Sequence, residues 1–295
     1  MMKTLLPLAA CGAALVVVPL VQAQPARNPG VLRMALVSMK SQYSDSPDAA
    51  ANRKNIQVNL DRHFYFIEKA VAQGAEFVGF PELSINGYKF SANMTWLSLD
   101  GPEVQSLARK AAEKKIYVAA GIAELDAAGK KWNTHFVIGP DGKVVGWHHK
   151  IWLTAERGHT GIGSHHNVFD VKGLRMGMAT CADNTDYLNA KALVDKGAQI
   201  IYGPHANTTG STLAGWYKFR ARWGGPWDGT FVKSKTSNDG PEADMPSGGW
   251  MAQLKVYAAL HNHAGLYNPE FDPPATNDTS NRFAGGAWFI APDGT

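Results

Sequence analysis

Residues 76–82 read Glu-Phe-Val-Gly-Phe-Pro-Glu, a short apolar run that ends at a proline and is followed at once by a carboxylate. Such a run predicts a buried strand, and the proline ends it because proline has no N–H for a sheet. On the N-terminal side, residues 31–37 form another apolar run, and residues 55–73 carry apolar side chains at helical spacings of three and four. On the C-terminal side, residues 103–115 predict a second helix and residues 116–122 a third strand. This alternation of strands and helices predicts an α/β protein built in layers.

The rest of the chain is richer in strands than in helices. A Pro-Asp-Gly turn at 140–142 separates two strand-like runs and predicts a β-hairpin. The segment from about 206 to 249 is rich in Gly, Pro, Ser, Thr and Trp, and we expect a long loop that serves as a lid or an insertion. The elements predicted here are strands at 134–138, 143–149, 168–171, 175–180, 199–202, 256–262 and 287–290, and a helix at 186–196.

The composition is that of a globular protein, with 295 residues of which 45% are hydrophobic and 18% charged. The length is sufficient for the core of one large domain, and disorder, collagen-like repeats and a coiled coil are excluded for the chain as a whole. The net charge of +4 is spread without runs of like charge, so it does not indicate a nucleic-acid partner.

The first residues have the pattern of an export signal. Lys3 precedes an uncharged stretch at 5–21, and small residues follow up to Ala23. We therefore expect a signal peptide over 1–23, a secreted or periplasmic protein, and no stable membrane insertion beyond the signal. Two alternatives are a transmembrane anchor, for which the stretch is barely long enough, and lipoprotein anchoring through Cys11.

Removal of this signal would leave residues 24–295 as a single domain with one cysteine, Cys181. Exported proteins usually pair their cysteines, so an unpaired one is either a buried inert thiol or a nucleophile.

Three residues follow the ends of predicted strands, where α/β proteins often place their working groups. They are Glu82, Lys150 and Cys181. A cysteine at a strand-to-helix turn lies near backbone N–H groups that favour a thiolate, a lysine adds positive charge, and a glutamate can accept a proton. Each residue also has an ordinary interpretation, as a helix cap, a solvated strand end and a core side chain.

The sequences around these residues resemble the motifs of one enzyme superfamily. Residues 80–88, FPELSINGY, resemble the first signature of the carbon–nitrogen hydrolase (nitrilase) superfamily. Residues 139–153 are similar to the hairpin that ends in its catalytic lysine, and residues 175–183 are similar to its nucleophile strand. The order Glu, Lys, Cys also agrees.

The resemblance implies a role for each residue. Cys181 would attack an amide or nitrile carbon and form an acyl thioester. Glu82 would accept the thiol proton, protonate the leaving nitrogen and later activate water. Lys150, with the backbone N–H of Ala182, would stabilise the oxyanion, and Glu156 would orient Lys150 or the substrate. The resemblance implies no metal and no cofactor.

Residues near these positions are candidates for substrate contacts. Ala182 stands where the family commonly has an aromatic residue, while Asp183 keeps the family's acid, and this pair favours amides over nitriles. We expect Tyr88, Trp152, Ala182, Asp183 and His205 to contact the substrate.

The aromatic and basic residues of the insertion either line the substrate pocket or pack beneath a long loop. These residues are Trp216, Arg220, Arg222, Trp223, Trp227 and Trp250.

Paired histidines suggest a competing function in metal binding. They occur at 148–149, 165–166 and in the run 261–263. Carboxylates and cysteines do not cluster around them at ligand spacing, so we do not expect a metal site.

Taken together, these features predict an amidase with the family's four-layer α-β-β-α sandwich, acting on a small molecule and assembling as a homodimer or a larger homo-oligomer. The alternatives are a nitrilase, an acyl transferase at the same site, or a binding protein that has lost its chemistry. The chain stops at Thr295 just after a Pro-Asp-Gly turn, whereas the similar pattern at 135–142 continues into a return strand. We therefore expect that the C-terminal part is truncated or that a partner chain covers this sheet edge.

Overall fold

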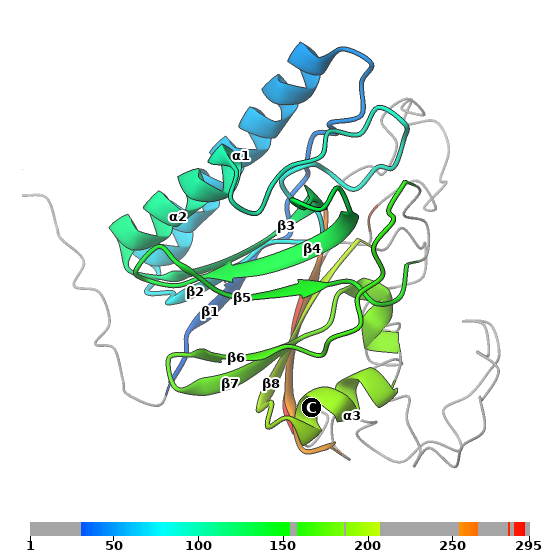
Figure 1. The fold of residues 1–295 in the computed structure, drawn as a ribbon. Coiled ribbons are helices and arrows are strands. Elements are labelled where there is room, and N and C mark those ends of the chain that lie inside the picture. The colour runs from blue at the N-terminus through cyan, green and yellow to red at the C-terminus, as the bar shows by residue number, and fades with distance from the viewer. Residues whose placement is uncertain are drawn as a thin grey trace, which may run out of the picture.

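The computed structural model describes residues 31–153, 158–185, 187–206, 254–264, 283 and 286–292. Its fold is shown in Figure 1. The predicted signal peptide, Glu156 and the insertion from residue 207 onward lie outside these residues.

Two sheets of five strands make up the centre of the molecule. Sheet A has the order β1-β2-β3-β4-β5 and sheet B the order β10-β9-β8-β7-β6. Sheet A contains β1 (Met34–Leu36), β2 (Phe77–Gly79), β3 (Tyr117–Leu125), β4 (Lys131–Ile138) and β5 (Val144–His149). Sheet B contains β6 (Val168–Val171), β7 (Leu174–Met178), β8 (Ile200–His205), β9 (Tyr257–Asn262) and β10 (Ala287–Ile290). The helices are α1 (Ala49–Ala72), α2 (Pro102–Lys114), the 3-10 helix η1 (Cys181–Thr185) and α3 (Tyr187–Asp195).

Both sheets are mixed. In sheet A, β1, β2 and β3 run parallel, and β3, β4 and β5 form antiparallel hairpins. In sheet B, β7, β8 and β9 run parallel, and β6 and β10 are antiparallel at the two edges. The parallel strands bring the loops that follow β2, β7 and β8 to the same ends of their sheets.

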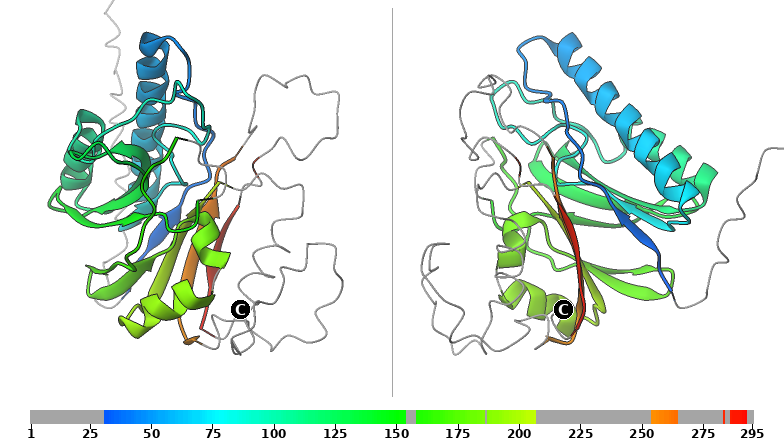
Figure 2. Two further views of the ribbon diagram at one scale, coloured as in Figure 1. Left: turned by 45° about the vertical axis from the view of Figure 1, so that its right-hand side comes forward. Right: turned by 180° about the vertical axis from the view of Figure 1, so that it is seen from behind.

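The sheets stack face to face, with helices on their outer faces, as Figures 1 and 2 show. On β2, Val78 packs with the α1 and α2 side chains Ile67 and Leu107, whereas Phe77 points to the other side and packs with Tyr202 of β8. This alternation is the period of two expected for a strand that is buried on both faces. Helix α3 covers the outer face of sheet B, where Leu193 packs with sheet residues. The predicted four-layer α-β-β-α sandwich is confirmed.

Gly79, the last residue of β2, allows the two sheets to approach closely. A Cβ atom at this position would lie 2.6 Å from the hydroxyl oxygen of Tyr202. Only glycine leaves room for a buried tyrosine directly behind the strand.

The structure also differs from the sequence prediction in its element boundaries. Helix α1 begins at Ala49 rather than 55, because the side chain of Asp48 caps its first turn by accepting a hydrogen bond from Ala50 N at 2.8 Å. Strands β3 and β4 are longer than predicted, and Asp126 orders the turn between them through the main chains of Ala128 and Lys130. Among the described helices, none combines the length and the apolar character needed to cross a membrane.

Candidate active site

Glu82 lies in a tight loop directly after β2. Its side chain is fully buried. The neighbouring Leu83 has a φ of 50°, in the left-handed region that costs energy for a residue with a Cβ. Gly121 of β3 lets this loop lie against the sheet, since a Cβ there would be 2.5 Å from Leu83 N. The loop is therefore held in a strained conformation by its surroundings.

Lys150 follows β5 and points at Glu82. Its Nζ lies 2.8 Å from Glu82 Oε1, and both side chains are excluded from solvent. Asn133 of β4 donates from Nδ2 to the same carboxylate oxygen at 2.8 Å, and its main-chain oxygen accepts from Lys150 N at 2.9 Å. A buried charge pair is stable only where its geometry is good and further hydrogen bonds support it, and Asn133 supplies such bonds to both partners.

Cys181 is the first residue of η1, three residues beyond the end of β7. It is a buried thiol and has a φ of 49°. The turn around it is closed by Asp183, whose N donates to Thr180 O at 3.0 Å, while Thr180 N donates to Asp183 Oδ2 at 3.2 Å. Backbone strain at a reactive residue is typical of sites that hold a nucleophile in one orientation.

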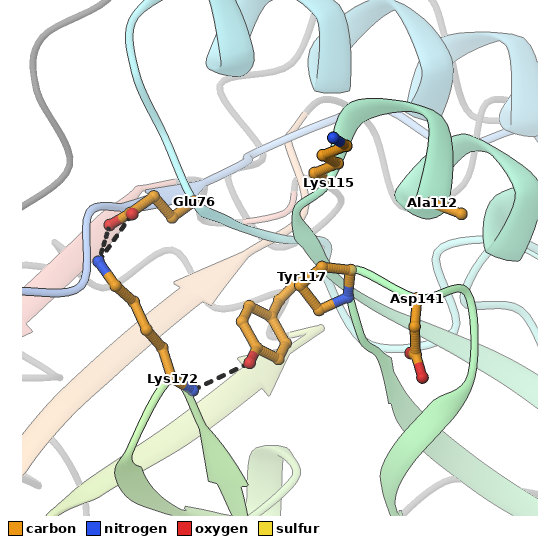
Figure 3. Close-up of a pocket in the computed structure, with 7 residues that line it drawn as sticks. Glu76, Ala112, Lys115, Tyr117, Asp141 and Lys172 are labelled. Carbon is orange, nitrogen blue, oxygen red and sulfur yellow. Dashed lines mark hydrogen bonds and ion pairs between the residues drawn. The ribbon is translucent and has the colours of Figure 1, made fainter. Parts of the chain in front are cut away.

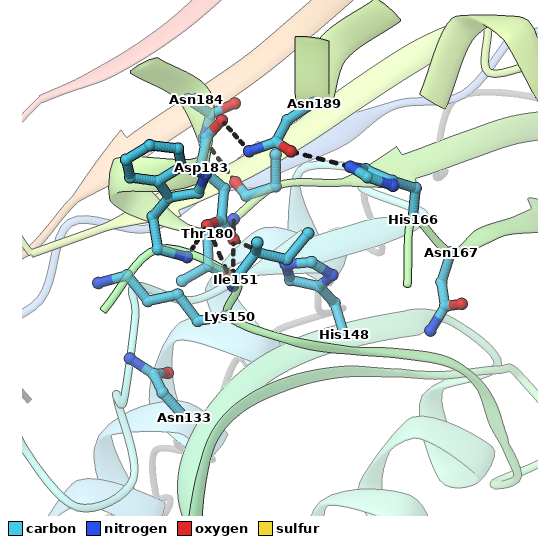
Figure 4. Close-up of polar contacts among 12 residues, drawn as sticks. Asn133, His148, Lys150, Ile151, His166, Asn167, Thr180, Asp183, Asn184 and Asn189 are labelled. Atoms are coloured by element: carbon cyan, nitrogen blue, oxygen red, sulfur yellow. Dashed lines mark hydrogen bonds and ion pairs between the residues drawn. The ribbon is translucent and has the colours of Figure 1, made fainter. Parts of the chain in front are cut away.

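Asp183 also joins the cysteine turn to the lysine segment, as Figure 4 shows. Its Oδ1 accepts from Ile151 N at 3.1 Å and from Trp152 N at 2.7 Å. Its Oδ2 lies 2.8 Å from Nε2 of His148, and both of these side chains are buried. Because Lys150 lies between His148 and Ile151 in the chain, one carboxylate fixes the distance between lysine and cysteine segments.

The predicted triad thus comes from three strand ends that the fold brings together. Glu82 and Lys150 are in direct contact, and Asp183 connects the Lys150 segment to Cys181. Such a site contains a thiol, a carboxylate and a cation in a buried region. These are the groups needed for nucleophilic attack, proton transfer and stabilisation of a developing oxyanion.

Two of the predicted substrate contacts lie beside Lys150. The ring of Tyr88 is buried with its centroid 5.9 Å from Lys150 Nζ, and its edge contacts Phe90. Trp152 is 44% exposed while its main-chain N is bonded to Asp183, so its indole stands at the surface next to the lysine. Contact of Tyr88 and Trp152 with substrate stays a prediction.

Asp183 and His205 are bonded to protein groups, and their contact with substrate stays a prediction. The oxygens of Asp183 accept hydrogen bonds from protein N–H groups, so its side chain links two segments of the chain. His205 ends β8 and is buried, with Nδ1 2.9 Å from Gly203 O. Ala182 lies half-buried between Cys181 and Asp183. Its predicted oxyanion contact stays a prediction, as does the role of Glu156, which lies outside the described residues.

Four buried histidines surround the loop that carries Glu82. Burial lowers the pKa of His63, His261 and His263 to about 4, and it lowers the pKa of His135 well below the usual value of 6.5. Burial likewise raises the pKa of Tyr202, whose hydroxyl lies 2.8 Å from His261 Nε2. These rings are therefore neutral at pH 7.

The histidine pairs that suggested a metal are bonded to protein groups. Within the described part of the chain, no group of three or more His, Cys, Asp or Glu side chains is arranged to hold an ion. His148 bonds to Asp183 and His263 to the main chain of Glu82.

A hollow of about 500 Å³ lies at the opposite ends of the strands, as shown in Figure 3. Glu76, which precedes β2, and Lys172, in the turn between β6 and β7, form an ion pair there at 2.7 Å. None of Glu82, Lys150 and Cys181 lines it. The hollow is lined by Glu76, Ala112, Lys115, Tyr117, Pro140, Asp141 and Lys172.

Sequence reasoning missed Asn133 and the structural role of His148. The sequence carries no clear signal for Asn133, because it lies among other polar residues of β4, Lys131, Thr134 and His135. The signal for His148 is its alternation with Lys150, which places both residues on the same side of the hairpin.

We compared the chain with known protein families and with curated proteins. The family profile described as Carbon-nitrogen hydrolase matches residues 33–295. Nitrilase 2 of Arabidopsis thaliana is 28% identical over 202 residues, which is 60% of this chain and 56% of that protein. The omega-amidase NIT2 of Homo sapiens is 30% identical over 170 residues, 54% of this chain and 61% of that protein. The chain thus spans little more than half the length of these curated relatives.

Solved structures share the fold at lower identity. An amidase from Nesterenkonia sp. superposes with a TM-score of 0.66 at 19% identity, covering 91% of this chain and 86% of that one. A mutant of the same amidase shows covalent addition of the acetamide moiety of fluoroacetamide at its active site cysteine, with a TM-score of 0.65, 19% identity, and coverage of 90% of this chain and 84% of that one.

Proposed function

The chain belongs to the carbon–nitrogen hydrolase family, and from this premise we propose that it is an amidase that releases ammonia or an amine from a small linear amide. The observation that carries the proposal is the buried contact between Glu82 Oε1 and Lys150 Nζ at 2.8 Å, next to the Cys181 turn. A buried carboxylate and ammonium beside a thiol are costly for stability, so their presence favours a chemical role.

The proposed reaction has two halves. In the first, Cys181 Sγ attacks the amide carbon, its proton passes to Glu82, and the carbonyl oxygen becomes an oxyanion that Lys150 stabilises. Glu82 then gives the proton to the leaving nitrogen, the C–N bond breaks, and an acyl thioester remains on Cys181. In the second, Glu82 takes a proton from water, the resulting hydroxide attacks the thioester, and the C–S bond breaks. The acid is released and Cys181 and Glu82 return to their initial states.

An amide is favoured over a nitrile by the sequence after the nucleophile. Ala182 stands where nitrile-cleaving relatives typically carry tryptophan, and Asp183 stands in place of their glutamate. The names of the relatives include both amidases and nitrilases. Nitrile hydrolysis is therefore the second candidate, and acyl transfer to an amine the third.

The test is incubation of the purified protein with a panel of small amides and nitriles, following ammonia release and the mass of the Cys181 peptide. We expect ammonia from at least one amide, an acyl adduct on Cys181, and no turnover by Cys181→Ala. Ammonia from nitriles alone would favour the nitrilase, and hydroxamate formed with added hydroxylamine would reveal acyl transfer. Unchanged amide hydrolysis by Cys181→Ala would overturn the mechanism.

We also propose that the protein is exported, on the pattern of residues 1–23. Expression of the full chain in a bacterium, followed by fractionation and N-terminal sequencing, tests this. A mature N-terminus at Gln24 in the periplasm or medium is expected, and an uncleaved cytoplasmic protein would contradict it.

A further inference from the structure

We propose that His263 is a positioning residue for Glu82, holding the main chain of the proposed general base in the orientation that the reaction requires. The inference rests on the function proposed above for Glu82. It assigns a role to a histidine that the sequence pattern associated only with metal binding.

His263 lies just beyond β9 in sheet B, and its ring is fully buried. Nε2 lies 2.6 Å from the main-chain oxygen of Glu82, 181 positions away in the chain. A carbonyl oxygen can only accept a hydrogen bond, so Nε2 must carry the proton and donate it. The contact is short for an N–H···O bond and joins sheet B to the catalytic loop of sheet A.

Within the loop, Ser84 N donates to Pro81 O at 3.2 Å and Gly87 N donates to Leu83 O at 2.8 Å, and neither of these bonds involves Glu82. Pro81 has no N–H to donate, and Leu83 has a left-handed φ of 50°. A strained segment persists only where its surroundings fix it. The His263 bond acts on the one residue between these two, at the carbonyl group next to the Cα atom that carries the Glu82 side chain.

Hydrogen bonds from other elements also reach the residues two positions before and after Glu82, Phe80 and Ser84. The hydroxyl of Tyr202 lies 3.2 Å from Phe80 O, and Ser41 Oγ donates to Ser84 O at 3.1 Å. The outer bonds hold the ends of the loop, whereas His263 holds its centre. Of these three, only His263 is bonded to Glu82 itself.

The ring acts as a neutral donor. The hydrogen bond to the main-chain oxygen of Glu82 favours its protonated form, but burial is the larger influence and lowers the pKa of His263 to about 4. A neutral ring adds no charge beside the ion pair of Glu82 with Lys150. The effect of His263 is therefore geometric, and we expect it in kcat rather than in the affinity for substrate.

His261 provides a matched control within the same strand. Its ring is also fully buried, and burial also lowers its pKa to about 4. It bonds to Val37 O at 3.0 Å and to the hydroxyl of Tyr202 at 2.8 Å, rather than to Glu82. Substitution of either histidine by methionine removes one buried ring of similar size, so the two variants should lose similar thermal stability.

The experiment compares His263→Met, His261→Met and His263→Gln in the full chain. Two measurements are made on each variant. The first gives kcat and KM for an amide that the protein hydrolyses. The second gives the rate at which iodoacetamide alkylates Cys181, followed by mass spectrometry of the Cys181 peptide. We expect His263→Met to lower kcat by about 10- to 100-fold with KM nearly unchanged, and to slow alkylation. His263→Gln, which keeps an N–H donor at similar reach, should recover most of both rates. His261→Met should stay within a few-fold of wild type.

The proposal is overturned if kcat and the alkylation rate fall equally in His263→Met and His261→Met, or if neither falls in His263→Met. If His263→Met does not fold, His263→Gln and His263→Asn replace the pair, because the shorter asparagine cannot reach Glu82 O; equal rates in these two would also refute it. Alkylation needs no turnover. If the wild-type protein hydrolyses no amide but alkylation of Cys181 still depends on His263, the amidase proposal is refuted and the positioning role of His263 stands.

Discussion

The Glu82 loop and the Cys181 turn solve the same structural problem in different ways. Both follow the end of a parallel strand, and both contain a residue with a Cβ in the left-handed region, Leu83 at φ 50° and Cys181 at φ 49°. The Glu82 loop is held from outside by neutral rings and hydroxyls of distant elements, namely His263, Tyr202 and Ser41. The Cys181 turn is held by side chains of its own turn, the carboxylate of Asp183 and the amide of Asn184, which donates to Ala179 O.

The two arrangements suit the charges of the residues that they carry. A neutral donor fixes Glu82 without disturbing the proton that this carboxylate exchanges in the proposed mechanism. A carboxylate near Cys181 accepts four N–H groups and so is itself engaged. The Glu82 loop should therefore be sensitive to protonation of the histidines around it, and the Cys181 turn to removal of the single acceptor Asp183.

Acid should produce the largest effect, and it acts on the Glu82 side. The native pKa values of His63, His261 and His263 are about 4, below the unfolded value of 6.5. As pH falls from 6.5 to 4, the unfolded chain binds protons that the native protein does not, so the free energy of unfolding falls, by up to about 3 kcal/mol for each histidine. Urea denaturation at pH 7.5, 6 and 5 measures this. A flat profile down to pH 5 would contradict the prediction.

Substitution of Asp183 should have the next largest effect, on the Cys181 side. Asp183→Ala leaves four donors without their acceptor and separates Lys150 from Cys181, so we expect a loss of about 3–5 kcal/mol in stability and about 100-fold in kcat. Asp183→Asn, which keeps one acceptor oxygen, should lose less. Denaturation curves and initial rates give both numbers. The decrease in the free energy of unfolding between pH 6.5 and 4 should be the same in Asp183→Ala as in wild type. If the variant lacks this decrease, the Glu82 loop and the Cys181 turn are not held independently.

Two glycines provide a smaller and matched test. Gly121→Ala places a Cβ 2.5 Å from Leu83 N, a main-chain atom that cannot move aside, and should cost about 1–3 kcal/mol. Gly177→Ala on β7, near the Cys181 turn, meets side-chain carbons of Leu193 and Ala198 at 3.1 and 3.2 Å and should cost less. Thermal melts of both variants compare them. A larger loss in Gly177→Ala would mean that the cysteine side is the more tightly packed of the two.

Ser41→Ala should have the smallest effect. It removes the hydroxyl that donates to Ser84 O at 3.1 Å, at an edge of the Glu82 loop, and we expect about 1 kcal/mol of stability and a change in kcat below about threefold. Melting temperature and steady-state rates are sufficient. A tenfold loss in kcat would show that Ser41, whose Oγ also lies 3.5 Å from His263 Nδ1, takes a larger part in positioning Glu82 than its bond to Ser84 alone predicts.

The sequence was sufficient for the features that local rules determine. The apolar run before Pro81, the stripe on α1 and the Pro-Asp-Gly turn predicted elements that the structure contains, and the motifs around Glu82, Lys150 and Cys181 led to the four-layer fold. Strand ends are local as well, so each of these residues was correctly placed after a strand.

The supports of the site were not predictable in the same way. The bond from His263 to Glu82 joins residues 181 positions apart, and the bonds from Asp183 to Ile151 and Trp152 join residues 32 and 31 positions apart. Pattern and spacing report which face a residue lies on but not which distant carbonyl it meets. Asp183 was therefore expected to face substrate, and His263 was considered only as a metal ligand.

The central bond of the Glu82 loop also has a consequence for the order of folding. The loop belongs to the first third of the chain, yet its donor, His263, is supplied by β9 and the adjoining residue, and His261 meets Val37 across 224 positions. Contacts of such long range form late and slowly, because the chain must close large loops before they stabilise anything. Helices α1 and α2 can form while the rest of the chain is still being synthesised, whereas the reactive centre must wait for β9. During refolding, catalytic competence should therefore return after the helical signal.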